Sequence, residues 1–215
     1  MKKKFLSLMM AAAVVATTSV SAFAQDTIIN NADNTSPTTE VQITGSVTDR
    51  NGTMPDSTFK VTVPTTATFS VNQSGVFSAP TLTVKNEGTQ KVGVYAYSFK
   101  DNSGEGKINI LSPSDFAQKL TENRDSVKRS DVKITLRGQF GDEVHLSSTN
   151  EHGVNTSESF SNTRGADGFK LLELEASTDG TAKSGTISLD GTAGKASTDA
   201  VSDTFVLTLK IKKVQ

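Results

Sequence analysis

Two histidines and the acids around them are the residues of this chain best suited to chemistry. His145 and His152 lie in one short stretch with Asp142, Glu143 and Glu151. Imidazole and carboxylate groups are common zinc ligands, but this spacing matches no helical or hairpin ligand pattern. We therefore expect these side chains to be solvated loop residues and predict no metal site.

Two acidic turns are similar to calcium-binding loops. Asp101–Glu105 reads Asp-Asn-Ser-Gly-Glu, and Asp49–Gly52 reads Asp-Arg-Asn-Gly. Neither carries the full twelve-residue pattern that ends in a bidentate Glu. Asn and Asp tolerate a positive φ, so both segments are predicted to be hairpin turns. We expect no cofactor.

No arrangement typical of a catalytic nucleophile is visible. A serine hydrolase needs Ser, His and a carboxylate in contact, and no serine here lies in a Gly-x-Ser-x-Gly elbow. Arg164–Asp167 differs by one residue from an integrin-binding tripeptide and reads as a turn. A lysine–asparagine isopeptide crosslink needs an apolar-buried pair with a carboxylate, whereas Lys133 is predicted to point outward. The chain is therefore predicted not to be an enzyme.

The elements that position these residues are predicted to be β-strands. The clearest is Asp203–Lys212, in which Phe205, Leu207, Leu209 and Ile211 fall on one face. Such alternation is typical of a strand with one buried side. Similar segments, separated by Gly-containing turns, are Val41–Val47, Phe59–Val63, Phe69–Val71, Leu82–Val84, Val92–Phe99, Val132–Leu136, Leu172–Leu174 and Ile187–Leu189.

In the segment Val92–Phe99, the side chains of Val92, Val94 and Ala96 are predicted to face one way and those of Tyr95, Tyr97 and Phe99 the other, so the segment is apolar on both faces and a central strand is predicted. Many short strands with such turns favour an all-β fold, an antiparallel β-sandwich of Ig-like or jelly-roll-like form. One short helix is predicted from Ser112 to Asn123: Ser112 is a candidate N-cap, Pro113 suits the first helical position, and Asp115 suits the positive end of the helix dipole.

The first residues have the three parts of a secretory signal peptide. Lys2–Lys4 are positively charged, Phe5–Val15 is apolar, and Ala22–Ala24 is a small-x-small cleavage site. We expect cleavage after Ala24. The apolar run is shorter than the roughly 20 residues of a membrane-spanning helix, so no transmembrane anchor is predicted.

The predicted organisation after residues 1–24 is a flexible leader followed by one domain. The leader covers residues 25–39, which are polar and rich in Asn and Thr, and the β-sandwich covers residues 40–215. A polar loop, 147–168, is long enough to be functional or disordered.

Charge limits the possible partners, and the absence of cysteine limits how the fold can be stabilised. Without the three signal lysines the 22 basic residues fall to 19, against 23 acidic residues, so no basic stripe for nucleic acid is expected. The chain has no cysteine, so the predicted exported fold depends on its core and not on disulfides, a usage common in Gram-positive exports.

The segments Phe59–Asn72 and Leu82–Thr89 resemble secreted β-sandwich surface proteins of Firmicutes. These include the WxL-like wall-associated proteins and, more distantly, the filament-forming camelysin/TasA-type matrix proteins. The chain has no tryptophan, so it lacks the Trp-x-Leu signature and peptidoglycan binding is not carried over from the resemblance.

We therefore expect an exported, extracellular or cell-surface structural or adhesive protein. In a filament or matrix, the leader and Glu40–Val47 of one copy would pair with an open sheet edge of the next, because exposed edges template strand addition. The alternative is a non-catalytic cell-wall or glycan-binding module that uses the loop 147–168. The expected partners are a second copy or a wall polymer.

Overall fold

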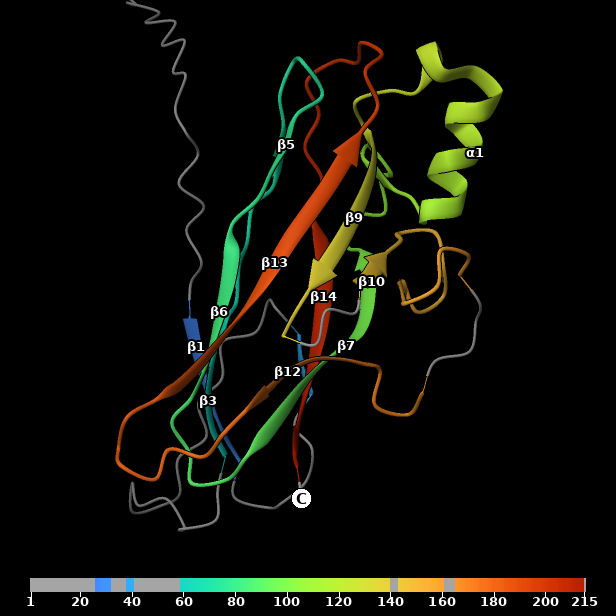
Figure 1. The fold of residues 1–215 in the computed structure, drawn as a ribbon. Helices are drawn as coiled ribbons and strands as arrows, with labels where there is room; N and C mark the ends of the chain where they lie inside the picture. The colour runs from blue at the N-terminus through green and yellow to red at the C-terminus, as the bar shows by residue number, and fades with distance from the viewer. Residues whose placement is uncertain (1–25, 32–37, 41–58, 140–142, 161–164, 215) are drawn as a thin grey trace, which may run out of the picture.

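The structure is a computed structural model that describes residues 26–31, 38–40, 59–139, 143–160 and 165–214. Among these residues, most of the regular secondary structure consists of antiparallel sheets, and one short α-helix lies at the side (Figure 1). The predicted β-rich class with one helix is therefore confirmed. The predicted signal peptide and the predicted strand Val41–Val47 lie outside the described residues.

The strands vary from two to eleven residues. In chain order the elements are β1 Asp26–Asn31, β2 Thr38–Glu40, β3 Phe59–Pro64, β4 Ser70–Val71, β5 Phe77–Ser78, β6 Thr81–Asn86, β7 Val92–Asp101, β8 Asn109–Ile110, α1 Pro113–Asn123, the 3-10 helix η1 Arg124–Ser126, β9 Asp131–Arg137, β10 Glu143–Leu146, β11 Val154–Asn155, β12 Phe169–Leu174, β13 Lys183–Ala193 and β14 Phe205–Lys213.

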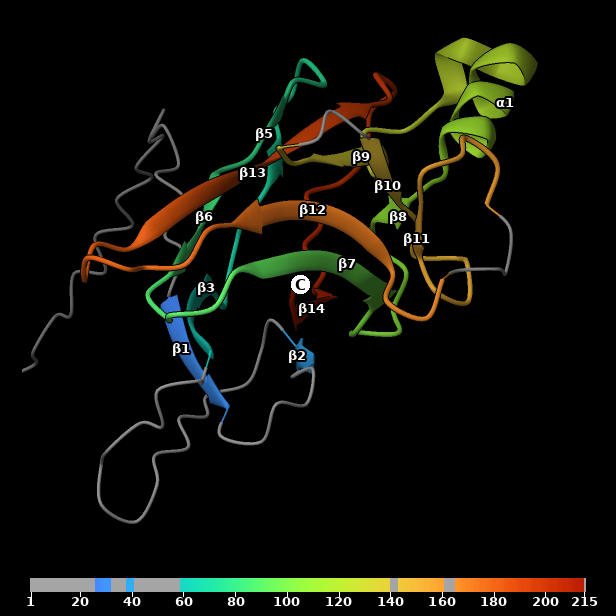
Figure 2. The same cartoon turned by 60° about the horizontal axis from the view of Figure 1, so that its bottom comes forward.

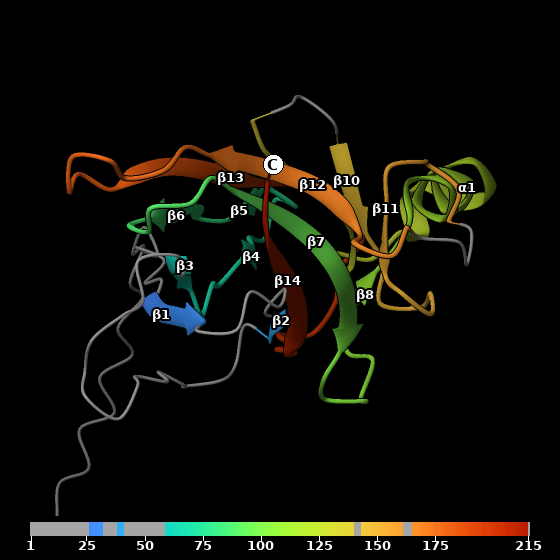
Figure 3. The same ribbon diagram turned by 90° about the horizontal axis from the view of Figure 1, so that it is seen from below.

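Two principal sheets form the fold. The larger has the order β1-β3-β6-β13-β9-β10-β11, and β8 pairs with β9 as the one parallel neighbour among the described strands. The smaller has the order β12-β7-β14-β2, and a short hairpin, β4-β5, stands beside them. Seen from below, the strands follow a curved path around a common interior (Figure 3).

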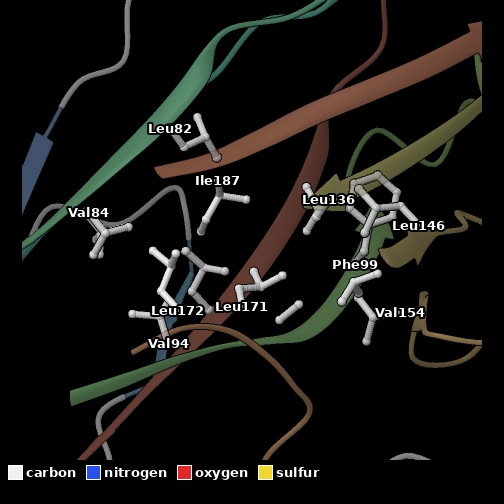
Figure 4. Packing of buried hydrophobic residues seen from close by; sticks show 14 of the residues in the cluster. Leu82, Val84, Val94, Phe99, Leu136, Leu146, Val154, Leu171, Leu172 and Ile187 are labelled. Carbon is white, nitrogen blue, oxygen red and sulfur yellow. The ribbon is translucent and has the colours of Figure 1, made fainter. Parts of the chain in front are cut away.

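The two sheets share one hydrophobic core. Leu82, Val84 and Ile187 reach it from the larger sheet, whereas Val94 and Leu172 reach it from the smaller one (Figure 4). Burial alternates along β6, as the sequence pattern predicted, because successive side chains point to opposite faces of a strand. Burial of this apolar surface is the main stabilising contribution to the fold.

β7 lies between β12 and β14, which confirms the prediction of a central strand (Figure 2). The predicted orientation of Phe99 was wrong. Ala96 pairs with Leu209 and Ser98 with Thr208, so Tyr97 is an extra residue, a β-bulge. The bulge shifts the alternation by one residue and brings Phe99, 5 % exposed, into the core with Ala96.

The helix begins and ends where the sequence predicted. Ser112 is its N-cap, and Ser112 Oγ accepts a hydrogen bond from the backbone N–H of Asp115 at 3.1 Å. Proline occupies the first helical position, where its missing N–H costs no helical hydrogen bond. Phe116 anchors the helix by packing with Leu111 and Val127 in a small apolar cluster of their own.

Two segments predicted to be irregular contain strands. β1 and β2 lie within the predicted leader, where β1 pairs with β3 and β2 pairs with β14. The loop 147–168 contains β11 and docks on β7: Phe99 N–H donates to the carbonyl of His152 at 2.9 Å. Gly153 has φ +65°, and a Cβ there would lie 1.9 Å from the Phe99 carbonyl oxygen. Backbone contacts therefore order this polar segment.

Candidate functional site

A cavity of about 760 Å³ opens into the core between the two principal sheets. We call it the inter-sheet cavity. One wall is the segment 64–73, which follows β3, and the other is the segment 198–204, which leads into β14. Its apolar lining includes core side chains from both sheets, namely Leu82, Ile134, Leu146, Leu189, Leu207 and Leu209.

The rim of this cavity is polar, unlike its floor. Six of the ten residues in the wall 64–73 are polar, four of them Thr or Ser, and the wall 198–204 contributes Thr198, Asp199 and Ser202 among others. A rim of hydroxyl groups around an apolar floor suits an occupant with a hydrogen-bonding backbone and apolar side chains.

A row of phenylalanine rings joins the two walls. Phe69 stacks on Phe77 at 5.4 Å and lies 6.2 Å from Phe205, which stacks on Phe99 at 5.4 Å. The row runs from the β4-β5 hairpin through β14 to β7. Offset aromatic pairs add stabilisation beyond their buried area. The row therefore holds the two walls of the cavity at a set distance from each other.

Arg129 also connects the walls. Its guanidinium donates through Nη1 to the carbonyl of Gln73 at 2.8 Å and through Nη2 to the carbonyl of Thr198 at 3.1 Å. The rigid fork of donors on an arginine can hold two acceptors at a set separation. The mouth of the cavity is therefore held by one side chain from the segment before β9.

The start of β14 is held by a second polar contact. Asp203 Oδ2 accepts backbone N–H bonds from Lys107 at 3.0 Å and Ile108 at 3.2 Å. Burial alone raises the pKa of Asp203, but the hydrogen bonds from Ser103, Ile108, Thr204 and Lys107 outweigh it and lower the pKa. The carboxylate therefore holds the segment before β14 against the β7–β8 connection.

One edge of β14 has a partner over only part of its length. The strand pairs with β7 from Phe205 to Lys213, but on its other edge β2 pairs only with Thr208, Leu209 and Lys210. Among the described strands, none pairs with that edge at residues 205–207. This short stretch of edge borders the cavity, since Phe205 and Leu207 line it.

We predicted no metal site at the two histidines, and the structure places them in different elements. His145 is buried on β10, where its Nδ1 and Thr135 Oγ1 are hydrogen-bonded at 3.0 Å, and burial lowers its pKa. His152 lies in the loop that docks on β7. The described residues contain no group of three His, Cys, Asp or Glu side chains that could hold a metal, and Asp142 lies outside them. The prediction of a solvated loop was wrong for His145, because β10 carries it into the sheet.

The segment Asp101–Glu105 forms a turn, but not the predicted hairpin turn, because β7 and β8 belong to different sheets. Asp101 Oδ1 accepts the backbone N–H groups of Ser103 at 2.8 Å and Gly104 at 3.1 Å. Its other oxygen accepts the N–H of Gly106 at 3.2 Å, so both oxygens are used within the turn. The segment Asp49–Gly52 lies outside the described residues.

The structure also locates Lys133 and part of the segment Arg164–Asp167, which the sequence analysis considered as possible sites. In the segment Arg164–Asp167, Arg164 is outside the described residues, and Asp167 forms ion pairs with Lys210 at 2.8 Å and Lys212 at 2.5 Å. These lysines lower the pKa of Asp167. Lys133 is half-buried on β9, opposite Thr192 of β13.

The outer face of the smaller sheet carries a tyrosine that sequence reasoning did not select. The Tyr95 ring lies across Gly93, since a Cβ on that glycine would meet the ring at 2.8 Å. Lys170 of β12 and Lys210 of β14 are its cross-strand neighbours. Tyr97 lies under Lys210, whose Nζ is 5.5 Å from the ring centre.

In the described residues, no helix has the length and apolar character needed to cross a membrane. Comparison with known proteins gives no match: no protein-family model, no curated protein and no solved structure is significantly similar to this chain.

Proposed function

We propose that this chain is an exported structural protein of the cell surface or extracellular matrix, which assembles into filaments by strand addition between copies. The observation that supports this proposal best is the inter-sheet cavity beside an edge of β14 that, among the described strands, has a partner at only three residues. The protein is non-enzymatic in this proposal, and the signal peptide predicted in residues 1–24 supplies the export.

The cavity and the edge together match the requirements of strand addition. An added strand gains main-chain hydrogen bonds from a free edge, and alternate side chains enter pockets on one side. Residues 205–207 offer the edge, and Phe205 and Leu207 face the cavity. A ligand that bound only in the cavity would make no hydrogen bonds to the edge of β14.

The register of β2 identifies the strand that fits. Thr38 pairs with Lys210, Thr39 with Leu209 and Glu40 with Thr208. If Glu40–Val47 of a neighbouring copy pairs in the same antiparallel register, its Val41 lies opposite Leu207 and its Ile43 opposite Phe205. In the proposed filament, Glu40–Val47 of a neighbouring copy takes this position, and its apolar side chains enter the cavity.

The described contacts of β1 and β2 support exchange between copies. Each strand pairs with an edge of one sheet, β1 with β3 and β2 with β14, so the leader meets both sheets. A segment that satisfies an edge within one copy can satisfy the same edge of a neighbour, which is the basis of domain swapping. The leader is thus suited to connect each subunit to the next one along a filament.

Electron microscopy and light scattering of the purified mature chain test this function. We expect filaments or a ladder of oligomers. Ile43→Lys should abolish assembly because it introduces a charge into the apolar cavity, whereas Gln42→Lys, on the opposite face of the same strand, should retain it. Monodisperse single copies of the unaltered protein over a wide concentration range would count decisively against filament formation.

A second candidate function is non-catalytic binding to a cell-wall or other glycan. The Tyr95 ring lies against Gly93, with Lys170 and Lys210 as its cross-strand neighbours, and an aromatic ring edged by polar groups can stack on a sugar ring. Retention of the protein by purified cell walls, lost in Tyr95→Ala or on deletion of residues 147–160, would favour this function over assembly.

A further inference from the structure

Three side chains from separate elements meet at one buried oxygen atom. Asp131, the first residue of β9, is 4 % exposed. Its Oδ1 accepts hydrogen bonds from Nδ2 of Asn109 at 3.0 Å and from Nζ of Lys119 at 2.9 Å. Its Oδ2 accepts the backbone N–H of Lys128 at 3.3 Å. An amine and an amide are therefore held side by side on one carboxylate.

The fold positions each member of this group. β8 and β9 are parallel neighbours in which Asn109 pairs directly with Asp131. Lys119 lies on α1 one turn after Phe116, and residues spaced by three share a helix face. The same face carries Phe116 into the apolar cluster with Leu111 and Val127.

Asp131 is buried close to a small apolar cluster. Phe116 and Val127 are 4 % and 2 % exposed, and they belong to the cluster that anchors α1, whose Lys119 reaches the carboxylate. The side chain of Lys119 is 43 % exposed, whereas that of Asp131 is 5 % exposed. Only a neutral amine is nucleophilic, so a proton must pass from Nζ to the carboxylate before the bond forms.

We propose that Lys119 and Asn109 form an intramolecular isopeptide bond, with Asp131 as the proton carrier. This inference is independent of filament assembly. The ammonium group of Lys119 gives one proton to Oδ1 of Asp131, and the neutral Nζ attacks Cγ of Asn109. A carboxylate within hydrogen-bonding distance of both the nucleophile and the leaving group is suited to this transfer.

The leaving group already lies against the proton carrier. Asp131 passes its proton to Nδ2 of Asn109, the Cγ–Nδ2 bond breaks, and ammonia leaves. Asp131 takes up the second proton of Nζ, and ammonia carries that proton away as ammonium. The Nζ–Cγ bond replaces Cγ–Nδ2, so the reaction needs no oxidant or co-reactant.

The product would join α1 to the end of β8 by a covalent bond. The chain has no cysteine and so forms no disulfide that could do this. In the structure α1 is attached to the sheets through the small apolar cluster and polar contacts such as the ion pair of Lys119 with Asp131. The crosslink would keep the helix in place after local unfolding of its surroundings.

Mass spectrometry of the purified, denatured chain tests the bond. We expect a mass about 17 Da below the sequence mass, which is the loss of one ammonia. An N-terminal Gln25 that cyclises loses the same mass, so the site must be located by tryptic digestion. We expect no cleavage after Lys119 and a peptide of residues 108–124 that carries the loss.

Two variants complete the experiment. Lys119→Arg keeps the positive charge but removes the nucleophile and should restore the full mass of that region. The matched control, Lys133→Arg on β9, should keep the loss. Quantitative recovery of an unmodified peptide 108–119 from the unaltered protein overturns the proposal, and this result does not depend on the folding of any variant.

Discussion

The phenylalanine row across the inter-sheet cavity leads to the prediction that we develop furthest. Phe205→Ala removes the ring that contacts both Phe69 and Phe99. Full burial of a phenylalanine contributes about 1.5–3 kcal/mol, and Phe205 is half-buried, so the low end applies. Each of its two ring pairs adds about 0.5–1.5 kcal/mol. We expect a total destabilisation of about 2.5–4.5 kcal/mol.

Urea unfolding followed by circular dichroism measures this change. With a denaturant dependence of about 2 kcal/mol per molar, the midpoint of Phe205→Ala should fall by roughly 1–2 M. Phe205→Leu retains most of the apolar area and loses only the ring pairs, so its effect should be about 1–3 kcal/mol. Val76→Ala, at a side chain that is 57 % exposed, is the control and should stay within about 0.5 kcal/mol.

A double-mutant cycle separates the ring contact from general loss of packing. Phe69→Ala and Phe205→Ala should show a coupling free energy of about 0.5–1.5 kcal/mol, because each single variant already breaks the Phe69–Phe205 pair. If Phe205→Ala were as stable as the unaltered chain within 0.5 kcal/mol, the row would not hold the walls together and our reasoning would be refuted.

Three further predictions concern other parts of the fold. Ser112→Ala should destabilise the chain by about 0.5–2 kcal/mol in urea unfolding, since it removes the N-cap bond to Asp115, whereas Ser112→Thr should retain most of it. Gly153→Ala should expose the loop 147–160 to limited proteolysis, because its Cβ would meet the Phe99 carbonyl; a protease-resistant variant would contradict the docking. The folded-state pKa of Asp167 is lowered by Lys210 and Lys212, so its contribution to stability is present above the unfolded pKa of about 3.9 and is lost as the pH falls through the folded value. The stability difference between the unaltered chain and Asp167→Asn should therefore be constant from pH 7 to pH 5 and shrink in more acidic buffer, and a constant difference down to pH 2 would contradict this.

Local features of the chain were predictable because local physics decides them. The helix from Pro113 to Asn123 follows from a serine N-cap and a proline that suits only the first turn. The core-facing positions Phe205, Leu207, Leu209 and Ile211 of β14 follow from the two-residue period of a strand, although Val206 and Thr208 on the other face are buried as well. Neither feature depends on what the element packs against.

Predictions that required knowledge of the neighbouring strand were less successful. Phe99 was expected on the face of Tyr95, but the bulge at Tyr97 turned it into the core. A bulge forms where two strands with their own twist and register must pair, so one strand's sequence does not reveal it. His145 was expected to be a solvated loop residue, but the pairing of β10 with β9 buried it.

The sequence by itself determined the β-rich class, the position of the helix and most strands of the core, because side-chain period and capping act over a few residues. Only the tertiary structure decided which strands are neighbours, where the inter-sheet cavity lies and that Asn109, Lys119 and Asp131 meet. Contacts between distant segments depend on the order and register of the strands, which are set by the packing of the whole core.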